Sequence, residues 1–345
     1  MPRIVDVVAE IAEVPLRHHF ATARDQLARQ VSRPVVIRLL MDDGSEAVGE
    51  AAAVAYVTGE TPETVLRDVA TAGPSLAGLE ITRIQPIEQA ITNALPQSPT
   101  ARAGVEMAAY NAFSQYTGVP LWRLFGGARR SVETDVTLSI VPDAPERARA
   151  AWDEGIRVFK VKLGSPDRES DFARLMAVSD AVPDARFRLD ANQAFTPDEA
   201  LAFLHRVLDA GLQVELLEQP VAAADLVGLN RVAAGSPVPV FADEAVKSPA
   251  DALRLVRESR VQGINVKLMK SGISGALDII AIARAAALKL MLGCMLETRR
   301  GIACSLALAC GTGAFDSIDL DSHILLREEG ENPYFEQRGS ELIVA

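Results

Sequence analysis

Two lysines lie two residues apart in an apolar segment of the sequence. In "VFKVKLG", Lys160 and Lys162 alternate with Phe159, Val161 and Leu163. Side chains alternate across a β-strand, so both ammonium groups are expected on the same face of a strand. Like charges side by side near apolar surface are costly unless something uses them. This pair is therefore a candidate for chemistry.

Three carboxylates follow apolar segments further along the chain. Asp190 stands in "RLDANQ", Glu218 in "LLEQP" and Asp243 in "FADE". Acids at the ends of neighbouring strands form an all-oxygen site, which suits Mg²⁺, and no His or Cys accompanies them, which disfavours zinc. Each motif alone could be a helix cap or a solvated loop. Together, they predict one Mg²⁺ per subunit.

A further lysine, Lys267 in "NVKLMKSG", follows the three acids, just as Lys162 precedes them. A neutral lysine on each side of a metal-bound carboxylate is suited to moving a proton from one face of a carbon to the other. Lys160 and the metal ion are expected to lower the pKa of Lys162. A buried ion network between the lysines and the carboxylates is the alternative.

The spacing of these residues indicates the elements that hold them. The polar residues at the carboxyl ends of the expected strands are Thr137, Lys162, Asp190, Glu218, Asp243, Lys267, Cys294 and Asp319. Successive members lie 25, 28, 28, 25, 24, 27 and 25 residues apart, as a repeating strand–helix unit requires. Eight such units predict an α/β fold with a (β/α)8, TIM-like barrel, whose chemistry lies at the carboxyl ends of the strands.

The first third of the chain has a different pattern. "IVDVVAEIAEV" and "PVVIRLLM" are typical of strands, and "MDDGSE" predicts a hairpin turn after the second. Helical patterns follow near 62–75 and 82–95, and a longer one is expected to be capped by Ser98 and to end at Gly118. A meander followed by helices predicts an α+β domain.

Composition limits the possible partners. The net charge of −11 argues against nucleic acid, and the most apolar stretch, "ISGALDIIAIARAAALKLML", is interrupted by charges, which argues against a membrane span. Three cysteines without CxxC spacing fit a reducing compartment. We therefore expect a cytoplasmic protein with a small-molecule substrate, and the sequence leaves a homo-oligomer open.

The order KxK, Asp, Glu, Asp, Lys resembles the enolase superfamily, in its muconate-lactonizing-enzyme subgroup. The resemblance implies that Asp190, Glu218 and Asp243 bind Mg²⁺, that Lys162 and Lys267 are the two acid/base residues, and that Lys160 contacts the substrate carboxylate. It also implies a capping domain over 1–125, a barrel over 126–320 and a C-terminal segment, 321–345, that returns to the cap. "KSGISGA" has only Gly272 where relatives usually have two adjacent glycines, so Lys267 is expected to shift slightly.

Residues near the eighth strand distinguish among subgroup members. Asp319 and Asp321 in "SIDLDSH" are similar to the Asp-x-Asp motif of dipeptide epimerases, whose carboxylates hold the substrate ammonium. Glu297 in "GCMLET" also resembles that group, and Thr137 joins these residues as a substrate-binding candidate. The resemblance implies a dipeptide epimerase that inverts the C-terminal residue by two-base transfer through an enediolate. The alternatives are an N-acylamino acid racemase, an o-succinylbenzoate synthase, a muconate cycloisomerase or a non-catalytic barrel.

The expected specificity loop lies in the cap. "RHHFATARDQLAR" resembles the corresponding loop of L-Ala-D/L-Glu epimerases, in which Thr-Ala is followed by one apolar residue and then an Arg. This chain has Arg24 and then Asp25 after Thr22-Ala23. An Asp at that place would repel a glutamyl side chain, whereas a shift of one residue would restore Arg24. A second loop, near Thr58–Glu60, is expected to close over the site.

Overall fold

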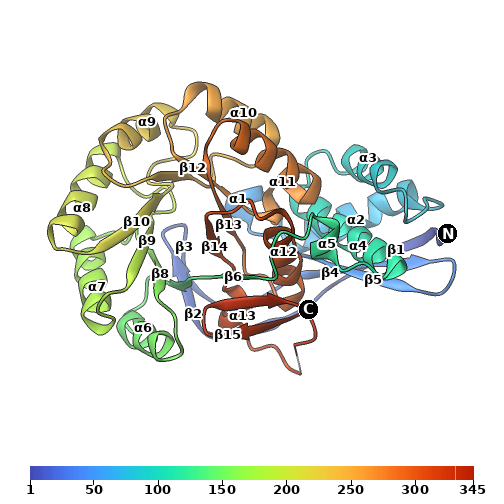
Figure 1. The fold of residues 1–345 in the computed structure, drawn as a ribbon, viewed down its shortest axis with the longest axis horizontal. Helices are drawn as coiled ribbons and strands as arrows, with labels where there is room; N and C mark the ends of the chain where they lie inside the picture. The colour runs from blue at the N-terminus through green and yellow to red at the C-terminus, as the bar shows by residue number, and fades with distance from the viewer. Residues whose placement is uncertain (331) are drawn as a thin grey trace.

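A computed structural model describes residues 1–330 and 332–345, and the side chains of 25–29 lie outside this description. The ribbon has two parts (Figure 1). One is a parallel eight-stranded sheet that curls into a nearly closed barrel with helices outside it, and the other is an N-terminal domain of antiparallel strands and helices. The expected (β/α)8-type barrel with an α+β domain in front of it is confirmed.

The N-terminal domain contains one three-stranded sheet, in the order β1-β4-β5, and one hairpin, β2-β3. Its strands are β1 (Ile4–Ile11), β2 (Val14–Thr22), β3 (Asp25–Ser32), β4 (Val35–Met41) and β5 (Glu46–Ala51). Its helices are α1 (Ala55–Thr58), α2 (Pro62–Leu76), α3 (Ile84–Ala94), α4 (Pro99–Thr117) and α5 (Leu121–Leu124). The predicted turn joins β4 to β5, with Gly44 in the left-handed conformation that glycine adopts most easily.

Helix α4 begins and ends where the sequence predicts, but its cap differs. Gly118 ends it in the left-handed conformation. Ser98 makes no side-chain cap, because its hydroxyl donates instead to Asp68 at 2.6 Å. The Glu60 carboxylate accepts the free N–H groups of Thr100 and Ala101, at 2.8 and 3.0 Å. The expectation that Ser98 caps this helix is therefore wrong.

The barrel strands are parallel neighbours in chain order from β7 to β14. They are β7 (Val136–Leu138), β8 (Val158–Lys162), β9 (Arg186–Asp190), β10 (Gln213–Glu218), β11 (Val240–Ala242), β12 (Gly263–Val266), β13 (Lys289–Gly293) and β14 (Ser317–Asp319). The helices between them are α6 (Ala144–Asp153), α7 (Arg168–Ala181), α8 (Pro197–Asp209), α9 (Leu226–Gly235), α10 (Pro249–Glu258), α11 (Leu268–Ala285) and α12 (Arg299–Thr312). The Asp135 N–H donates to the carbonyl of Ile318 at 3.3 Å, so the last strand meets the first.

Strand register brings the expected site residues into one row. Lys162 is paired with Asp190 across β8 and β9, and Asp190 with Glu218 across β9 and β10. Asp243 and Lys267 each follow directly on the end of a strand, β11 and β12. The carboxyl ends of the parallel strands thus gather these five residues at one end of the barrel.

The C-terminal segment contacts both parts of the molecule. It contains α13 (Ser322–Leu325), β15 (Phe335–Arg338) and β16 (Glu341–Val344). Leu326 bridges to Leu16 of the N-terminal domain. The hairpin β15-β16 instead pairs with β6 (Ser131–Glu133), which leads into the barrel.

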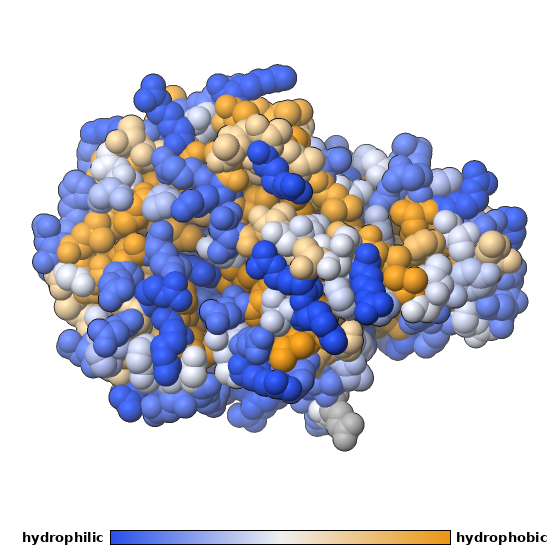
Figure 2. All heavy atoms as spheres, in the orientation of Figure 1, coloured by the Kyte–Doolittle hydropathy of each residue, from blue (hydrophilic) through white to orange (hydrophobic). Residues whose placement is uncertain are grey.

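Apolar side chains form one large core in the barrel and a second one in the N-terminal domain. The second lies between the sheet β1-β4-β5 and the helices α2 to α4. On the face that Figure 2 shows, hydrophilic side chains cover much of the surface, with hydrophobic ones between them. In the part of the chain that the structure describes, no helix combines the length and hydrophobicity of a membrane span.

A carboxylate of the N-terminal domain holds the segment that follows Lys267. Glu106 of α4 is fully buried and accepts the N–H groups of Ile273 and Ser274, the latter at 3.1 Å, as well as the Ser274 hydroxyl at 2.8 Å. These donors follow a kink in α11 at Gly272, where φ is 72° and ψ is −178°. The kink lets the helix after Lys267 present free N–H groups to the buried acid.

This kink predicts a strong dependence on glycine. A Cβ at position 272 would lie 2.5 Å from the Glu106 Oε2 atom, and the backbone there is one that only glycine adopts readily. We expect Gly272→Ala to lower the free energy of unfolding by about 2 kcal/mol or more, measured by urea denaturation. The matched control is Gly73→Ala in α2, whose Cβ would meet Val7 at 3.6 Å, and which should change stability by less than about 1 kcal/mol. Equal denaturation midpoints for the two variants would contradict this reading of the kink.

Candidate active site

Four lysines and four carboxylates are buried together at the carboxyl ends of the barrel strands. The lysines are Lys160, Lys162, Lys267 and Lys270, and the acids are Asp190, Glu218, Asp243 and Asp319. Each is at most 7% exposed. Burying a charge costs free energy unless the charge is paired. Every one of these eight side chains has an opposite charge within 3.2 Å.

Lys160 lies at the centre of this network. Its Nζ atom is 2.7 Å from Asp319, 2.9 Å from Glu218 and 3.2 Å from Asp190. Burial disfavours the charged form, but the carboxylates, Asp319 first among them, outweigh burial and raise the pKa of Lys160 well above its ordinary value. Lys160 is therefore a fixed cation among the acids.

Lys162 and Lys267 each face one carboxylate. Lys162 donates to Asp190 at 2.6 Å, and Lys267 donates to Asp243 at 2.9 Å. Burial and the charge of Lys160 would lower the pKa of Lys162, but Asp190 and the other nearby carboxylates together outweigh them and the pKa is raised. Asp243 raises the pKa of Lys267 in the same way, against burial. The groups of the protein together thus raise the pKa of Lys162, whereas the charge of Lys160 alone would lower it.

The three expected metal ligands have different electrostatic environments. Burial favours the neutral form of Asp190, but Lys162 and Lys160 outweigh it and hold its pKa at about 2. Burial and the charge of Asp190 raise the pKa of Glu218 to about 7. Lys267 and Lys270 overcome burial and hold the pKa of Asp243 well below its usual range.

Neighbouring polar groups fix the orientation of these acids. The Asn265 amide donates to Glu218 at 2.8 Å. Lys270 donates to an Asp243 side-chain oxygen at 2.6 Å and to its backbone carbonyl at 2.7 Å. The amide oxygen of Gln219 accepts the Asp243 N–H at 2.9 Å. Three buried, oriented carboxylates form an oxygen-only donor set, which fits Mg²⁺ once the lysine ammonium groups give up some of their contacts.

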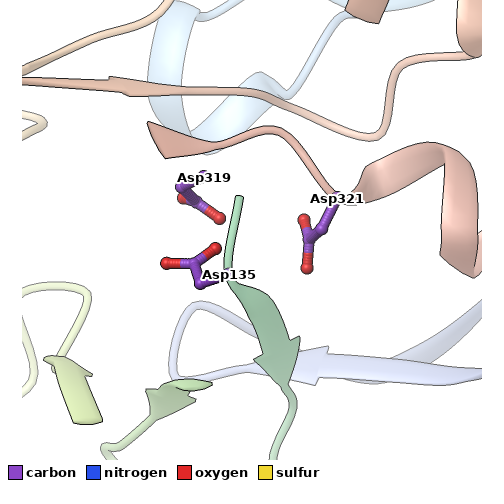
Figure 3. Close-up of side chains that lie close together, drawn as sticks. All are labelled: Asp135, Asp319 and Asp321. Carbon is purple, nitrogen blue, oxygen red and sulfur yellow. The ribbon is translucent and has the colours of Figure 1, made fainter. Parts of the chain in front are cut away.

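A second group of acids lies beside the first. Asp135, Asp319 and Asp321 are all buried, and their nearest oxygens lie within 4.8 Å of one another (Figure 3). Arg188 donates to Asp135 at 2.8 Å, Lys160 donates to Asp319, and the Thr137 N–H donates to Asp321. This group is a second plausible place for a cation.

A cavity opens above these residues between the barrel end and the N-terminal domain. Six of the expected site residues line it: Thr137, Lys162, Asp243, Lys267, Asp319 and Asp321. Asp190 and Glu218 are fully buried beneath it. Despite the single Gly272, Lys267 lines the cavity and stays within hydrogen-bond distance of Asp243.

Three other expected contacts are placed differently. Lys160 is 1% exposed and is not part of the cavity lining, so a direct contact with substrate is unsupported. Glu297 is also buried away from it, and burial, with a smaller effect of Glu50, raises the pKa of Glu297 to about 8. Arg24 is exposed and donates to Gln193 at 3.1 Å. The side chain of Asp25 lies outside the described residues.

Sequence reasoning missed several residues of this site. Asn265 is two positions before Lys267, so strand alternation could have placed it on the same face. Asn192 and Glu244 line the cavity and lie within the motifs that contain Asp190 and Asp243. The loop near Thr58–Glu60, expected to close over the site, lies at the end of α1, whose Val57 lines the cavity and offers its carbonyl to Lys247. No local pattern in the sequence marks that last contact.

Comparisons with known proteins agree with this geometry. Residues 4–126 match the family model for the mandelate racemase/muconate lactonizing enzyme N-terminal domain. Residues 143–339 match the enolase C-terminal domain-like model. The chain is 38% identical over 315 residues to an L-Ala-D/L-Glu epimerase of Thermotoga maritima, covering 91% of each chain. It is 34% identical over 348 residues to a hydrophobic dipeptide epimerase of Citrifermentans bemidjiense, covering 98% of this chain and 94% of that protein.

Solved structures give the same result. The substrate-liganded L-Ala-D/L-Glu epimerase of Bacillus subtilis superposes with a TM-score of 0.95 at 32% identity, over 99% of this chain and 96% of that one. A dipeptide epimerase of Enterococcus faecalis, complexed with Mg and L-Leu-L-Tyr, gives 0.94 at 31% identity, over 99% and 97%. The two family models cover both parts of the chain, and the chain belongs to the enolase superfamily, as a member of its mandelate racemase/muconate-lactonizing-enzyme group.

Proposed function

We propose that this protein is a Mg²⁺-dependent dipeptide epimerase that inverts the α-carbon of the C-terminal residue. The observation that carries the proposal is that Lys162 and Lys267 line the same cavity as the acid pair Asp319 and Asp321. A carbon bound between two lysines can lose a proton to one and regain it from the other. The relatives named above, which are epimerases of dipeptides, support this assignment.

The two lysines would act from opposite ends of the row of acids. Lys162 ends β8 and Lys267 follows β12, with the strands that carry Asp190, Glu218 and Asp243 between them. One lysine must be neutral to accept the α-proton, whereas the other must be charged to donate one. Because carboxylates raise the pKa of both lysines, any cation that neutralises Asp190 and Asp243 favours the neutral form of the adjacent lysine.

Asp190, Glu218 and Asp243 would hold the Mg²⁺. When bound, the ion supplies positive charge that stabilises the negative charge developing on the substrate carboxylate as the α-proton leaves. Gln219, Asn265 and Lys270 keep Glu218 and Asp243 oriented through the hydrogen bonds described above, and Lys162 donates to Asp190.

Asp319 and Asp321 would hold the ammonium group of the dipeptide. Both carboxylates line the cavity. Burial favours the neutral form of Asp319, but Lys160, Lys162 and Lys267 together outweigh it and lower its pKa, so Asp319 is ionised at neutral pH. Burial and the charge of Asp319 raise the pKa of Asp321 to about 6. A substrate without an ammonium group, such as an N-acyl amino acid or a cyclic dianion, would bring no cation to this acid pair, in which Lys160 pairs with Asp319 alone.

Replacing either lysine should abolish inversion. We expect Lys162→Ala and Lys267→Ala each to lower the rate of epimerisation by about 10³-fold or more, since each removes one of the two proton carriers. The assay is incubation of mixed L,L-dipeptides with Mg²⁺ in D2O, read by mass spectrometry. Lys289→Ala, at the exposed start of β13, is the control and should keep full activity. Near-full epimerisation by either variant, or turnover of acyl amino acids without any dipeptide exchange, would reject the proposal.

Mg²⁺ affinity should distinguish the two acid groups. We expect Asp190→Asn to weaken Mg²⁺ binding by at least about 10-fold, because it removes a charged ligand, while Asp135→Asn retains it. Isothermal titration calorimetry measures both, with circular dichroism to check that each variant is folded. The reverse result would place the ion at Asp135, Asp319 and Asp321 instead.

The acid limb of the pH profile should report Asp321. The ionised carboxylate binds the substrate ammonium, and its pKa is about 6, so kcat/KM should be full above this pH and fall as pH decreases through it. Rates measured between pH 5 and 8 test this expectation, with Asp321→Asn as the comparison. The variant should have a lower kcat/KM that no longer falls through this range, and an unchanged limb in the variant would assign the titration to another group.

A further inference from the structure

Part of the cavity lining is an apolar wall. It is formed by Phe20 of β2, Val57 of α1, Leu296 in the loop after β13, and Leu325 of α13. These four side chains come from both parts of the molecule, the first two from the N-terminal domain and the others from the barrel side. A substrate held by the lysines and acids therefore presents part of its surface to this wall.

The wall is a packed surface. Leu296 and Leu325 belong, with Phe20, to one apolar cluster around Leu16 and Leu326. The bridge between Leu16 and Leu326 fixes β2 against the C-terminal segment at this point. Val57 is 6% exposed and its carbonyl accepts from Lys247. Because neighbouring contacts fix these positions, the wall keeps its shape when a side chain packs on it.

No cation among the described residues stands on this wall. The described cations of the cavity lining are Lys162 and Lys267, and both face carboxylates. Arg24, the residue that could meet a glutamyl group, is exposed, outside the lining, and bonded to Gln193. A carboxylate buried without a counter-charge is costly, and the four acids of the lining would add repulsion to that cost.

A cationic substrate side chain is the alternative occupant of the cavity. Glu244 lines the cavity, and its Oε2 atom is buried without a hydrogen-bond partner among the described residues. The other oxygen of Glu244 accepts from Asn192 at 3.3 Å. Glu244 adjoins Asp243 at the end of a barrel strand, on the side of the catalytic groups, and no acid belongs to the apolar cluster of the wall. The wall itself matches an uncharged side chain.

We propose that the apolar wall of Phe20, Val57, Leu296 and Leu325 makes this protein selective for dipeptides with an apolar side chain, in preference to glutamyl or lysyl dipeptides. The inference rests on the proposed epimerase function and names the substrate class of that site. Each methylene that packs in such a pocket changes kcat/KM by about 10-fold or more. Burial of an unpaired charge penalises the charged analogues further.

The test compares α-proton exchange in D2O for six dipeptides: L-Ala-L-Leu, L-Ala-L-Glu, L-Ala-L-Lys and the three with the order reversed. Both orders are needed because either residue of the dipeptide could face the wall. We expect one leucyl dipeptide to have a kcat/KM at least about 10-fold above those of its glutamyl and lysyl counterparts. A higher kcat/KM for a glutamyl or a lysyl dipeptide would overturn the inference and leave the epimerase function standing. Exchange with none of the six, alongside turnover of an acyl amino acid, would overturn the function itself.

A charge placed on the wall should shift this preference. Phe20→Arg adds a guanidinium beside Leu296 and Leu325, and should raise the ratio of glutamyl to leucyl kcat/KM by at least about 10-fold. Val8→Arg is the matched control, since Val8 is 39% exposed on β1 and lies outside the cavity lining. Arg24→Ala should leave the ratios of the wild-type protein unchanged. A glutamyl preference that disappears in Arg24→Ala would show that Arg24 reads the side chain instead. The kcat/KM ratios of the wild-type protein test the proposed selectivity even where a variant does not fold.

Discussion

The contacts of the Lys160 ammonium group hold the site together. This group lies among Asp319, Glu218 and Asp190, from three different strands, all within 3.2 Å. Carboxylates so close together would repel one another and take up protons if no cation lay between them. Lys160 offsets part of their charge and, together with Lys162 and Lys267, keeps Asp190 and Asp319 ionised in a fully buried place. Acid/base chemistry and cation binding at this end of the barrel both depend on that balance.

The N-terminal domain completes this arrangement through buried acids of its own. Glu106 of α4 accepts N–H groups of α11 just after Lys267 and Lys270, and Glu50 of β5 accepts the N–H of Thr298 at the start of α12 at 2.8 Å. Each acid satisfies free N–H groups at a helix start in the barrel. The same domain supplies Phe20 and Val57 to the apolar wall of the cavity, so it both supports the catalytic segments and helps to shape the space for the substrate.

Much of the fold could be predicted because it follows from local patterns. The spacing of strand ends gave eight units, and Gly44 and Gly118 marked a turn and a helix end. Contacts between distant segments could not be predicted in this way. Ser98 has the chemistry of a cap, yet it donates to Asp68 while Glu60 caps the helix. A Ser98 cap and the observed contacts would each satisfy these polar groups, and only tertiary packing selects between the two arrangements.

The sequence by itself determined which residue types meet at the barrel end, because strand alternation and parallel register follow from local order along the chain. Lys162, Asp190 and Glu218 are neighbours for that reason. Only the tertiary structure decided what each group faces. Lys160 is enclosed by acids, Glu297 is buried away from the cavity, and Phe20 meets Leu296 and Leu325 across the two domains. The pKa values and the shape of the cavity depend on distances of a few ångströms between remote segments, which no local pattern specifies.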